Sequence, residues 1–207
     1  MAKLYFKYGT MNSSKSAQLI MVDYNYKDQG KETLIFKPRL DTRDGGYVKS
    51  RALDTKVEAN LVGTSEHNFM FNMTQQLRPN CVLVDEVQFM PPHQIEELAR
   101  IVDLLHIPVI CFGLMTDFQS QLFTGSKRLI ELGAILDEIK TVCWECKARA
   151  VHNMRYLDGK PTFSGKQVEV GGNEMYKPVC RKCYREEKEK YQLSLQPEIP
   201  HEQPETE

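Results

Sequence analysis

The chain carries, near its N-terminus, the stretch Gly9-Thr10-Met11-Asn12-Ser13-Ser14-Lys15-Ser16, with the spacing Gly-x-x-x-x-Ser-Lys-Ser. It lies between a strand-like run, Lys3 to Lys7, and a helical pattern that ends near Gly30. A turn in this position can wrap backbone N–H groups around phosphates, and the helix dipole favours their negative charge. Lys15 would then reach the β- and γ-phosphates, and the Ser16 hydroxyl would hold Mg²⁺. The stretch therefore predicts a phosphate-binding loop.

Ser14 stands where the usual phosphate-loop pattern has a second glycine. If that position needs a positive φ, serine costs about 1 kcal/mol more than glycine there. An ordinary polar turn that happens to contain Lys-Ser also explains the eight residues taken alone. Further motifs in the chain are needed to distinguish a phosphate-binding loop from an ordinary polar turn.

A second motif follows the hydrophobic run Cys81 to Val84, which predicts a buried strand ending on Asp85 and Glu86. In phosphate-loop proteins an acidic residue at this point positions Mg²⁺ or its water shell. Because side chains alternate along a strand, we expect Asp85 and Glu86 to point in opposite directions, one to the metal and one to a substrate hydroxyl. A solvated acidic strand end is the alternative, and the phosphate-loop pattern in the same chain favours the functional interpretation.

Strands and helices alternate over the N-terminal part of the chain. We expect strands at Thr33–Lys37 and Pro108–Leu114, and helices at Ser65–Leu77 and from Pro91 to Leu105. The polar, glycine-bearing segment Leu40–Lys56 is expected to be a loop. Elements of these lengths predict right-handed crossovers. The expected fold is α/β, a P-loop NTPase-like and mainly parallel sheet flanked by helices, over residues 1–139.

Four of the six cysteines form two Cys-x-x-Cys pairs, Cys143 with Cys146 and Cys180 with Cys183. Four thiolates suit tetrahedral Zn²⁺, and a site with four protein ligands is closed, so we expect structural zinc. A redox pair or free thiols are the alternatives, and two pairs in one short region argue against both. The remaining two, Cys81 and Cys111, lie in predicted core strands and are expected to be buried.

The composition changes after about Ile139. The turn-rich segment around the cysteine pairs predicts a small β-rich zinc-binding lasso domain at 140–191. Segment 192–207 has prolines, glutamates and little apolar material, and is expected to be a disordered tail. Gly171 and Gly172 would let the backbone approach a planar base, although a plain β-turn explains the pair more simply.

The totals restrict the class of protein. The 207 residues are 41% hydrophobic with a formal net charge of −1, so no global basic excess indicates nucleic-acid binding. No apolar run has the length of a signal peptide or a membrane span. We therefore expect a cytoplasmic location, where cysteines stay reduced, and neither a membrane nor a nucleic-acid partner.

Together these residues resemble one family, the zinc-containing thymidine kinases of the human-cytosolic and bacterial type. The resemblance extends from about Leu4 to Tyr184. Its matching pieces, in chain order, are Gly9 to Ser16, Lys37-Pro38 with Asp41-Thr42-Arg43, Asp85-Glu86-Val87-Gln88-Phe89, Gly113-Leu114 with Asp117-Phe118, both cysteine pairs, and Val170-Gly171-Gly172 with Tyr176.

The resemblance implies transfer of the γ-phosphoryl group of ATP to the 5′-hydroxyl of thymidine, with deoxyuridine as a further candidate acceptor, in DNA precursor salvage. It implies Glu86 as the general base and Arg43 near the transferring phosphate as the catalytic residues. ATP and its phosphates would be bound by Gly9, Thr10, Met11, Asn12, Ser13, Ser14, Lys15, Ser16, Asp85, Glu86, Val87 and Gln88. The groups on the magnesium side would be Ser16, Asp85 and Asp41. Thymidine would be bound by Met11, Phe89, Phe118, Val170, Gly171, Gly172 and Tyr176. The resemblance also implies a cytoplasmic homotetramer.

Two other classes of protein stay open at this point. A P-loop ATPase or switch protein would need a partner surface but no base pocket, and would hydrolyse ATP without thymidine. A zinc-dependent nucleic-acid-binding module has some support from the basic residues Lys177, Arg181, Lys182 and Arg185. The run that follows, Glu186 to Lys190, mixes both signs of charge and lacks the basic stripe that DNA demands.

Overall fold

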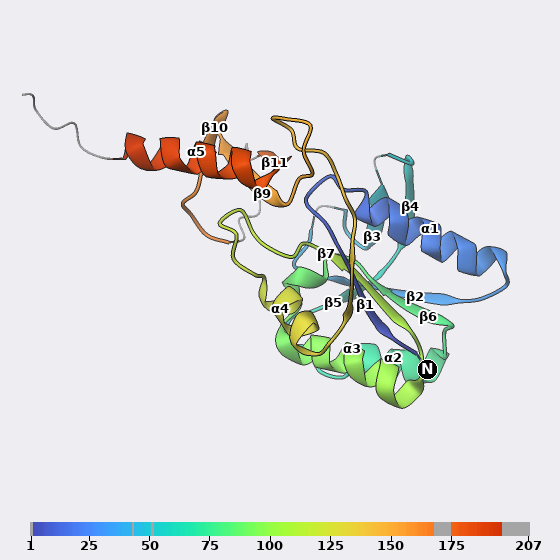
Figure 1. The fold of residues 1–207 in the computed structure, drawn as a ribbon. Helices are drawn as coiled ribbons and strands as arrows, with labels where there is room; N and C mark the ends of the chain where they lie inside the picture. Colours follow the sequence, from blue (N-terminus) through green and yellow to red (C-terminus); the bar gives the residue numbers. More distant parts are fainter. Residues whose placement is uncertain (1, 43, 51, 168–174, 196–207) are drawn as a thin grey trace, which may run out of the picture.

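The computed structural model describes residues 2–42, 44–50, 52–167 and 175–195. A six-stranded parallel sheet forms the centre of the N-terminal part (Figure 1). Its strands lie in the order β5 (Asn60–Val62), β2 (Thr33–Pro38), β6 (Cys81–Val84), β7 (Val109–Gly113), β1 (Leu4–Tyr8) and β8 (Ile135–Glu138). The inner strands are buried on both faces, as their apolar sequences indicate. This arrangement confirms the predicted α/β fold.

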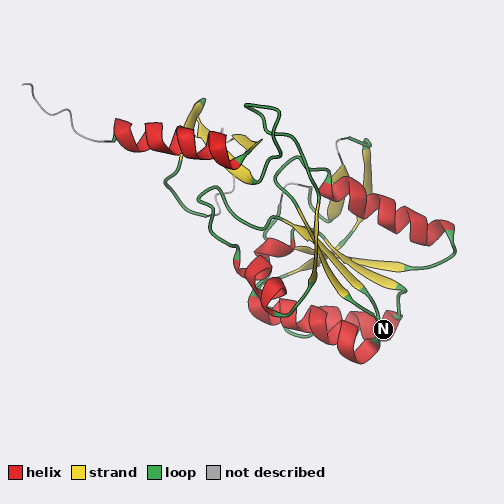
Figure 2. Cartoon of the chain, viewed as in Figure 1, coloured by secondary structure: helices red, strands yellow, loops and turns green. Residues whose placement is uncertain are grey.

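Helices cover both faces of the sheet (Figure 2). Helix α1 (Lys15–Asp28) packs on one face, and α2 (Phe69–Leu77), α3 (Pro92–Leu105) and α4 (Thr124–Glu131) lie on the other. Two hydrophobic cores result, one on each side, and neighbouring strand residues divide between them. Leu83 joins Leu19 of α1 in one core, whereas Val84 joins Leu98 of α3 in the other. Among the described helices, none has both the length and the apolar character needed to span a bilayer.

The expected loop over Leu40–Lys56 is wrong in part. Strands β3 (Tyr47–Ser50) and β4 (Thr55–Glu58) form an antiparallel hairpin in which Val48 faces Val57. Both strands are short and mostly polar, and Val48 enters the α1-side core, so the alternation is too weak to recognise in the sequence. Helix α2 also begins at Phe69, later than the predicted Ser65.

The C-terminal lobe contains a three-stranded antiparallel sheet in the order β10 (Lys160–Thr162), β9 (His152–Leu157), β11 (Met175–Val179). Helix α5 (Arg181–Ser194) follows β11 directly and packs against this sheet (Figure 1). A separate small core joins Met154, Tyr184 and two of the cysteines. The β-rich lobe is therefore confirmed, while the boundary at residue 139 stays a prediction. Helix α5 extends past the expected boundary at 191, and positions 196–207 of the predicted tail lie outside the described residues.

Candidate active site

The predicted phosphate loop connects β1 to α1 at the carboxyl edge of the sheet. The Gly9 amide donates to the Gly113 carbonyl at the end of β7 (3.3 Å). A Cβ at Gly9 would lie 2.4 Å from Ser13 Oγ and 2.6 Å from the Ile139 carbonyl oxygen, so the turn requires glycine. Ser14 has φ 66°, which confirms that the position of the usual second glycine is left-handed here.

Lys15, the first residue of α1, is buried within this loop. Its Nζ donates to the Thr10 carbonyl (2.7 Å) and lies 3.4 Å from Ser13 Oγ and 3.5 Å from the Gly9 carbonyl. The ammonium group therefore stands at the centre of the turn, where the sequence pattern predicted a cation for phosphate.

Asp85 lies at the end of β6, two strands away from the loop. Its backbone N–H donates to the Phe36 carbonyl (3.0 Å), and Ser16 Oγ donates to its Oδ2 (3.5 Å). The structure thus brings Ser16 and Asp85 together, as expected for two groups on the magnesium side. Burial, helped by the charge of Glu86, raises the pKa of Asp85 to about 7, and the charge of Lys37 opposes this rise.

Glu86 contacts other residues than Asp85 does, and its backbone differs from the predicted strand. The residue is left-handed, with φ 50° and ψ 38°, and begins the short 3₁₀ helix η1 (Val87–Phe89). Strand alternation therefore does not apply to it. Gln88 Nε2 donates to Glu86 Oε2 (2.5 Å), while Gln88 Oε1 accepts from the Leu114 amide (3.0 Å). The buried Gln88 thus holds the Glu86 carboxylate, a contact that the sequence did not indicate.

Lys37 is a further residue whose place in the site the sequence did not explain. It ends the apolar part of β2, and its Nζ lies 3.1 Å from Asp41 Oδ2 and donates to the Tyr47 carbonyl (3.1 Å). The charge of Lys37 opposes the rise in the pKa of Asp85, so this one lysine interacts electrostatically with both Asp41 and Asp85. The available signal was a charged residue inside a buried strand, which proteins keep only when it is paired. Arg43 lies outside the described residues.

Of the three aromatic side chains predicted to bind the base, Phe118 and Tyr176 contact each other, whereas Phe89 packs on another residue. Phe118 is buried, and its ring meets Tyr176 of β11 edge to face with centroids 6.5 Å apart. Phe89 packs edge to face on Phe123 at 5.8 Å. The Met11 amide donates to Asn153 Oδ1 of the C-terminal lobe (2.7 Å). Val170, Gly171 and Gly172 lie outside the described residues.

The four predicted metal ligands, Cys143, Cys146, Cys180 and Cys183, converge, with all four sulfur atoms within 4.8 Å of one another. Tetrahedral Zn–S bonds of about 2.3 Å imply S···S separations of about 3.8 Å. The Sγ atoms of Cys146 and Cys180 are 3.7 Å apart, which fits. The Cys183 amide donates to Cys180 Sγ and lowers the pKa of the Cys180 thiol to about 7, which favours the thiolate that binds metal. The group could therefore hold a metal ion.

The other two cysteines, Cys81 and Cys111, are buried in the sheet as expected. Burial raises the pKa of the Cys81 thiol to about 11 and also raises the pKa of Cys111. Both thiols therefore stay protonated and serve as small apolar side chains.

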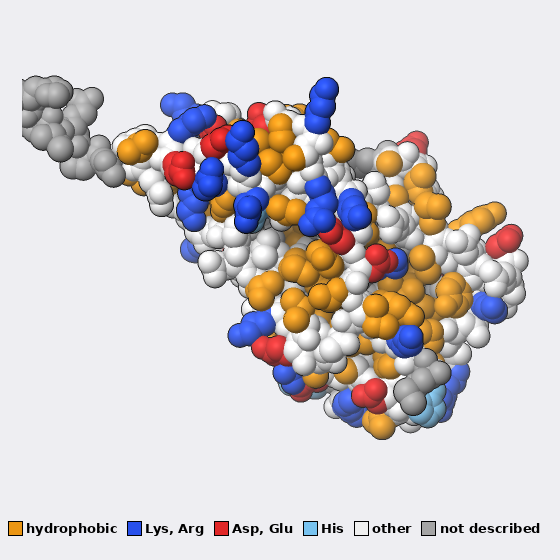
Figure 3. Space-filling model, in the orientation of Figure 1, with side chains coloured by type: hydrophobic (Ala, Val, Ile, Leu, Met, Phe, Trp, Pro, Cys, Tyr) orange, Lys and Arg blue, Asp and Glu red, His pale blue; other side chains and the backbone are white. Residues whose placement is uncertain are grey.

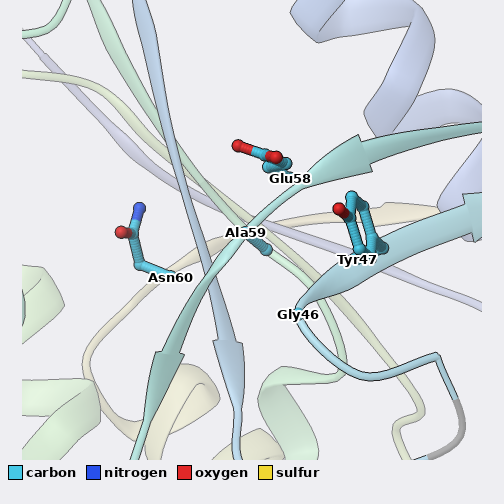
Figure 4. A pocket seen from close by; sticks show the side chains of 5 residues that line it. All are labelled: Gly46, Tyr47, Glu58, Ala59 and Asn60. Carbon is cyan, nitrogen blue, oxygen red and sulfur yellow. The ribbon is translucent and has the colours of Figure 1, made fainter.

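A surface hollow lies at the base of the β3–β4 hairpin (Figure 4). It is lined by Gly46, Tyr47, Glu58, Ala59 and Asn60. These residues are not among those that the sequence placed in the site. The hollow adjoins the site through Tyr47, whose carbonyl accepts from Lys37.

Lys and Arg side chains gather over the C-terminal lobe in Figure 3, with Asp and Glu between them. On α5, Lys182 pairs with Glu186 (3.7 Å) and Arg185 pairs with Glu189 (3.5 Å). The helix therefore presents the mixed-charge face that its sequence predicted.

Comparison with known proteins adds to this geometry. A family model described as "Thymidine kinase" matches residues 2–184. A thymidine kinase of Lactococcus lactis is 48% identical over 187 residues, which cover 89% of this chain and 97% of that protein. A thymidine kinase of Streptococcus pyogenes serotype M1 is 46% identical over 184 residues, with coverages of 89% and 97%. One from Enterococcus faecalis is 46% identical over 187 residues, with coverages of 89% and 95%.

Among solved structures, "Replication initiator DnaA bound to AMPPCP and single-stranded DNA" is similar at a TM-score of 0.40 and 18% identity. The match covers 67% of this chain and 40% of that chain. A likeness of this strength carries no argument about function.

Proposed function

Because this chain belongs to the thymidine kinase family, we propose that it transfers the γ-phosphoryl group of ATP to the 5′-hydroxyl of thymidine, giving dTMP and ADP in DNA precursor salvage. One observation carries the proposal. The loop around Lys15, the carboxylate of Asp85 and the carboxylate of Glu86 all lie at the carboxyl edge of one parallel sheet. Phosphoryl transfer requires this combination of phosphate cradle, charge compensation and proton acceptor.

The donor phosphates would bind at the β1–α1 turn. The backbone N–H groups of residues 9–16 and the N-terminus of α1 offer a positive environment, and the Lys15 ammonium stands at its centre. A triphosphate would replace the loop oxygens as the partner of Lys15. Arg43, which the family resemblance places near the transferring phosphate, would offset more of its charge.

Glu86 is the proposed general base. A 5′-hydroxyl is a poor nucleophile, and a carboxylate within hydrogen-bond reach accepts its proton as the new bond to phosphorus forms. Gln88 donates to one Glu86 oxygen and is itself held by the Leu114 amide. The carboxylate is thereby oriented before the acceptor binds, which lowers the entropic cost of the reactive geometry.

Mg²⁺ is proposed to accompany ATP. Hydroxyl and carboxylate oxygens are ligands that this ion prefers, and Ser16, Asp85 and Asp41 supply them. The ion would neutralise negative charge on the phosphates. With Mg²⁺ bound, Asp85 would be ionised, because the positive charge of the ion would oppose the effect of burial on the pKa of this carboxyl group.

Zn²⁺ is the metal that we propose for the four cysteines, in a closed structural site. The lobe that it stabilises carries Tyr176 against Phe118, so its order supports the proposed thymidine pocket. From the family resemblance we further propose that the enzyme is a cytoplasmic homotetramer.

The test is an ATP-dependent assay across a panel of nucleosides that includes thymidine and deoxyuridine, with products identified by mass. We expect dTMP and ADP to form in equal amounts from thymidine. The control is Lys15→Ala, in which transfer should be lost because the loop has no other cation at that point. ATP hydrolysis at the same rate with and without nucleoside, and without a phosphorylated nucleoside, would identify an ATPase instead.

A further inference from the structure

Asn153 connects the C-terminal lobe to the phosphate loop. Its side chain, on β9, is 4% exposed. Oδ1 accepts from the Met11 amide (2.7 Å), and Nδ2 donates to the Thr116 carbonyl (3.4 Å). Met11 belongs to the phosphate loop, and Thr116 follows β7 and directly precedes Asp117 and Phe118. One buried amide thus joins the proposed donor side and the proposed acceptor side of the site.

The contact between Asn153 and the Met11 amide lies directly before a left-handed turn of the phosphate loop. Met11 precedes Asn12, which is left-handed with φ 60°, so the direction of the Met11 amide is tied to the turn that follows. A partly buried N–H that loses its acceptor destabilises the conformation that holds it, so the acceptor oxygen of Asn153 stabilises this conformation of the loop. Asparagine is suited to this place because a single side chain both accepts from Met11 and donates to Thr116.

The position of Asn153 depends in turn on the cysteine cluster. In the β9–β11 pair, Asn153 faces Pro178, and the Val151 amide donates to the Val179 carbonyl (2.9 Å). The Trp144 amide donates to the Pro178 carbonyl (2.8 Å). Val179 precedes Cys180 and Trp144 follows Cys143, so both ends of this framework adjoin metal ligands.

We propose that Asn153 is a positioning residue through which the metal-bound lobe sets the conformation of the phosphate loop. The metal thereby affects ATP binding through a hydrogen-bonded chain that runs from the cysteines through β11 and β9 to the Met11 amide. The inference rests on the proposed function for the identity of the nucleotide, but its central claim concerns the conformation of residues 9–16.

Other contacts hold the lobe when Asn153 is changed. Tyr184 Oη donates to the Phe118 carbonyl (2.6 Å), and Gln119 Nε2 donates to the Phe163 carbonyl (3.1 Å). Ser120 Oγ lies 3.0 Å from His152 Nδ1. Loss of the Asn153 side chain should therefore free the Met11 amide without detaching the lobe. Gln119→Ala is the matched control, since it removes a tie between lobe and sheet but does not contact the phosphate loop.

The first test compares the metal-loaded wild type, Asn153→Ala and Gln119→Ala. We expect the KM for ATP to rise roughly 10-fold in Asn153→Ala, the effect of one lost, partly buried hydrogen bond, and to stay near the wild-type value in Gln119→Ala. Hydrogen exchange of the peptide that contains residues 9–16 should accelerate in Asn153→Ala alone. Unchanged exchange and unchanged KM for ATP in a folded Asn153→Ala protein would overturn the proposal.

The second test measures coupling. Chelation of the metal should weaken binding of ATP to the wild type, measured by calorimetry, and should weaken it by a much smaller factor in Asn153→Ala. An equal loss in both proteins would show that the metal acts by another route. If the metal-free protein unfolds, hydrogen exchange of residues 9–16 in the metal-loaded wild type and variants still tests whether Asn153 holds the phosphate loop. The hydrogen-exchange and calorimetric measurements use no thymidine, so a negative nucleoside assay would reject the proposed function without rejecting this inference.

Discussion

Lys37 and Asp41 form an ion pair inside the protein, with 3.1 Å between Nζ and Oδ2 and side-chain exposures of 1% and 4%. The same ammonium donates to the Tyr47 carbonyl. Its charge also opposes the rise in the pKa of Asp85 that burial causes. Buried charges persist only when they are paired and hydrogen-bonded. One lysine therefore compensates two carboxylates that the proposed reaction uses.

Lys37→Met should destabilise the protein by roughly 3–5 kcal/mol, because it removes the Lys37 ammonium from a buried ion pair with Asp41. Urea unfolding measures the change. The control is Lys182→Met, which removes an exposed pair with Glu186 and should cost less than about 1 kcal/mol. Adding Asp41→Leu to Lys37→Met should recover part of the loss, and a Lys37→Met protein as stable as the Lys182→Met protein would contradict this account.

Asp85 makes the stability of the unliganded protein depend on pH. Its pKa in the folded protein, about 7, exceeds the ordinary value of 3.8, so the folded state keeps a proton that the unfolded chain releases. The contribution of Asp85 to stability is therefore full below about pH 4 and is lost as the pH rises to about 7.

Asp85→Asn should abolish this part of the pH dependence. The variant should be more stable than the wild type at pH 8, by up to roughly 4 kcal/mol, since each tenfold change in proton affinity corresponds to about 1.4 kcal/mol. The difference should shrink towards pH 4. Urea unfolding without Mg²⁺ or nucleotide, repeated from pH 4 to pH 8, measures both. A constant difference across the range would show that Asp85 is ionised throughout.

Glu86→Gln preserves size and hydrogen bonding but cannot accept a proton. We expect kcat to fall by roughly 10²–10⁴-fold, with a much smaller change in the affinity for thymidine and ATP. Gln88→Met, which removes the donor to Glu86 but leaves the carboxylate, should lower kcat by a smaller factor. Steady-state kinetics distinguish the two, and a near-native kcat in Glu86→Gln would place the base elsewhere.

Ser14→Gly relieves the left-handed backbone at φ 66°. The gain in stability should be about 1 kcal/mol, with phosphate transfer retained or slightly improved, because the loop N–H groups keep their positions. Ser14→Ala keeps the strain and is the control. Thermal and urea unfolding of the three proteins test this expectation, and equal stability in all three would show that the turn is not strained.

The purified protein should contain about one Zn²⁺ per chain. Cys143→Ser should lose the metal, increase hydrogen exchange in β9 and β11 and lower activity, since metal binding and local folding are coupled. Cys111→Ala, which changes a buried thiol outside the cluster, should retain full metal content. A fully active wild-type preparation without zinc would contradict the structural role of the metal.

The sequence by itself determined the features that depend on neighbours along the chain. The spacing from Gly9 to Ser16 between a strand and a helix predicted the phosphate loop, and two Cys-x-x-Cys pairs predicted a metal site whose sulfur atoms do converge. Apolar runs such as Cys81 to Val84 predicted the buried strands of the α/β fold. The spacing of residues and the periodicity of apolar side chains are local properties of the chain, so they can be read directly from the sequence.

Only the tertiary structure decided which side chains are desolvated and what they contact. The pairing of β2 with β6 buries Lys37 near Asp85, and burial then raises the pKa of Asp85. The turn at Glu86 arises where β6 leads into η1, and the contact of Asn153 with Met11 joins two lobes. These relationships depend on distances between segments remote in sequence and on the removal of water from between them, so folding of the whole chain creates them.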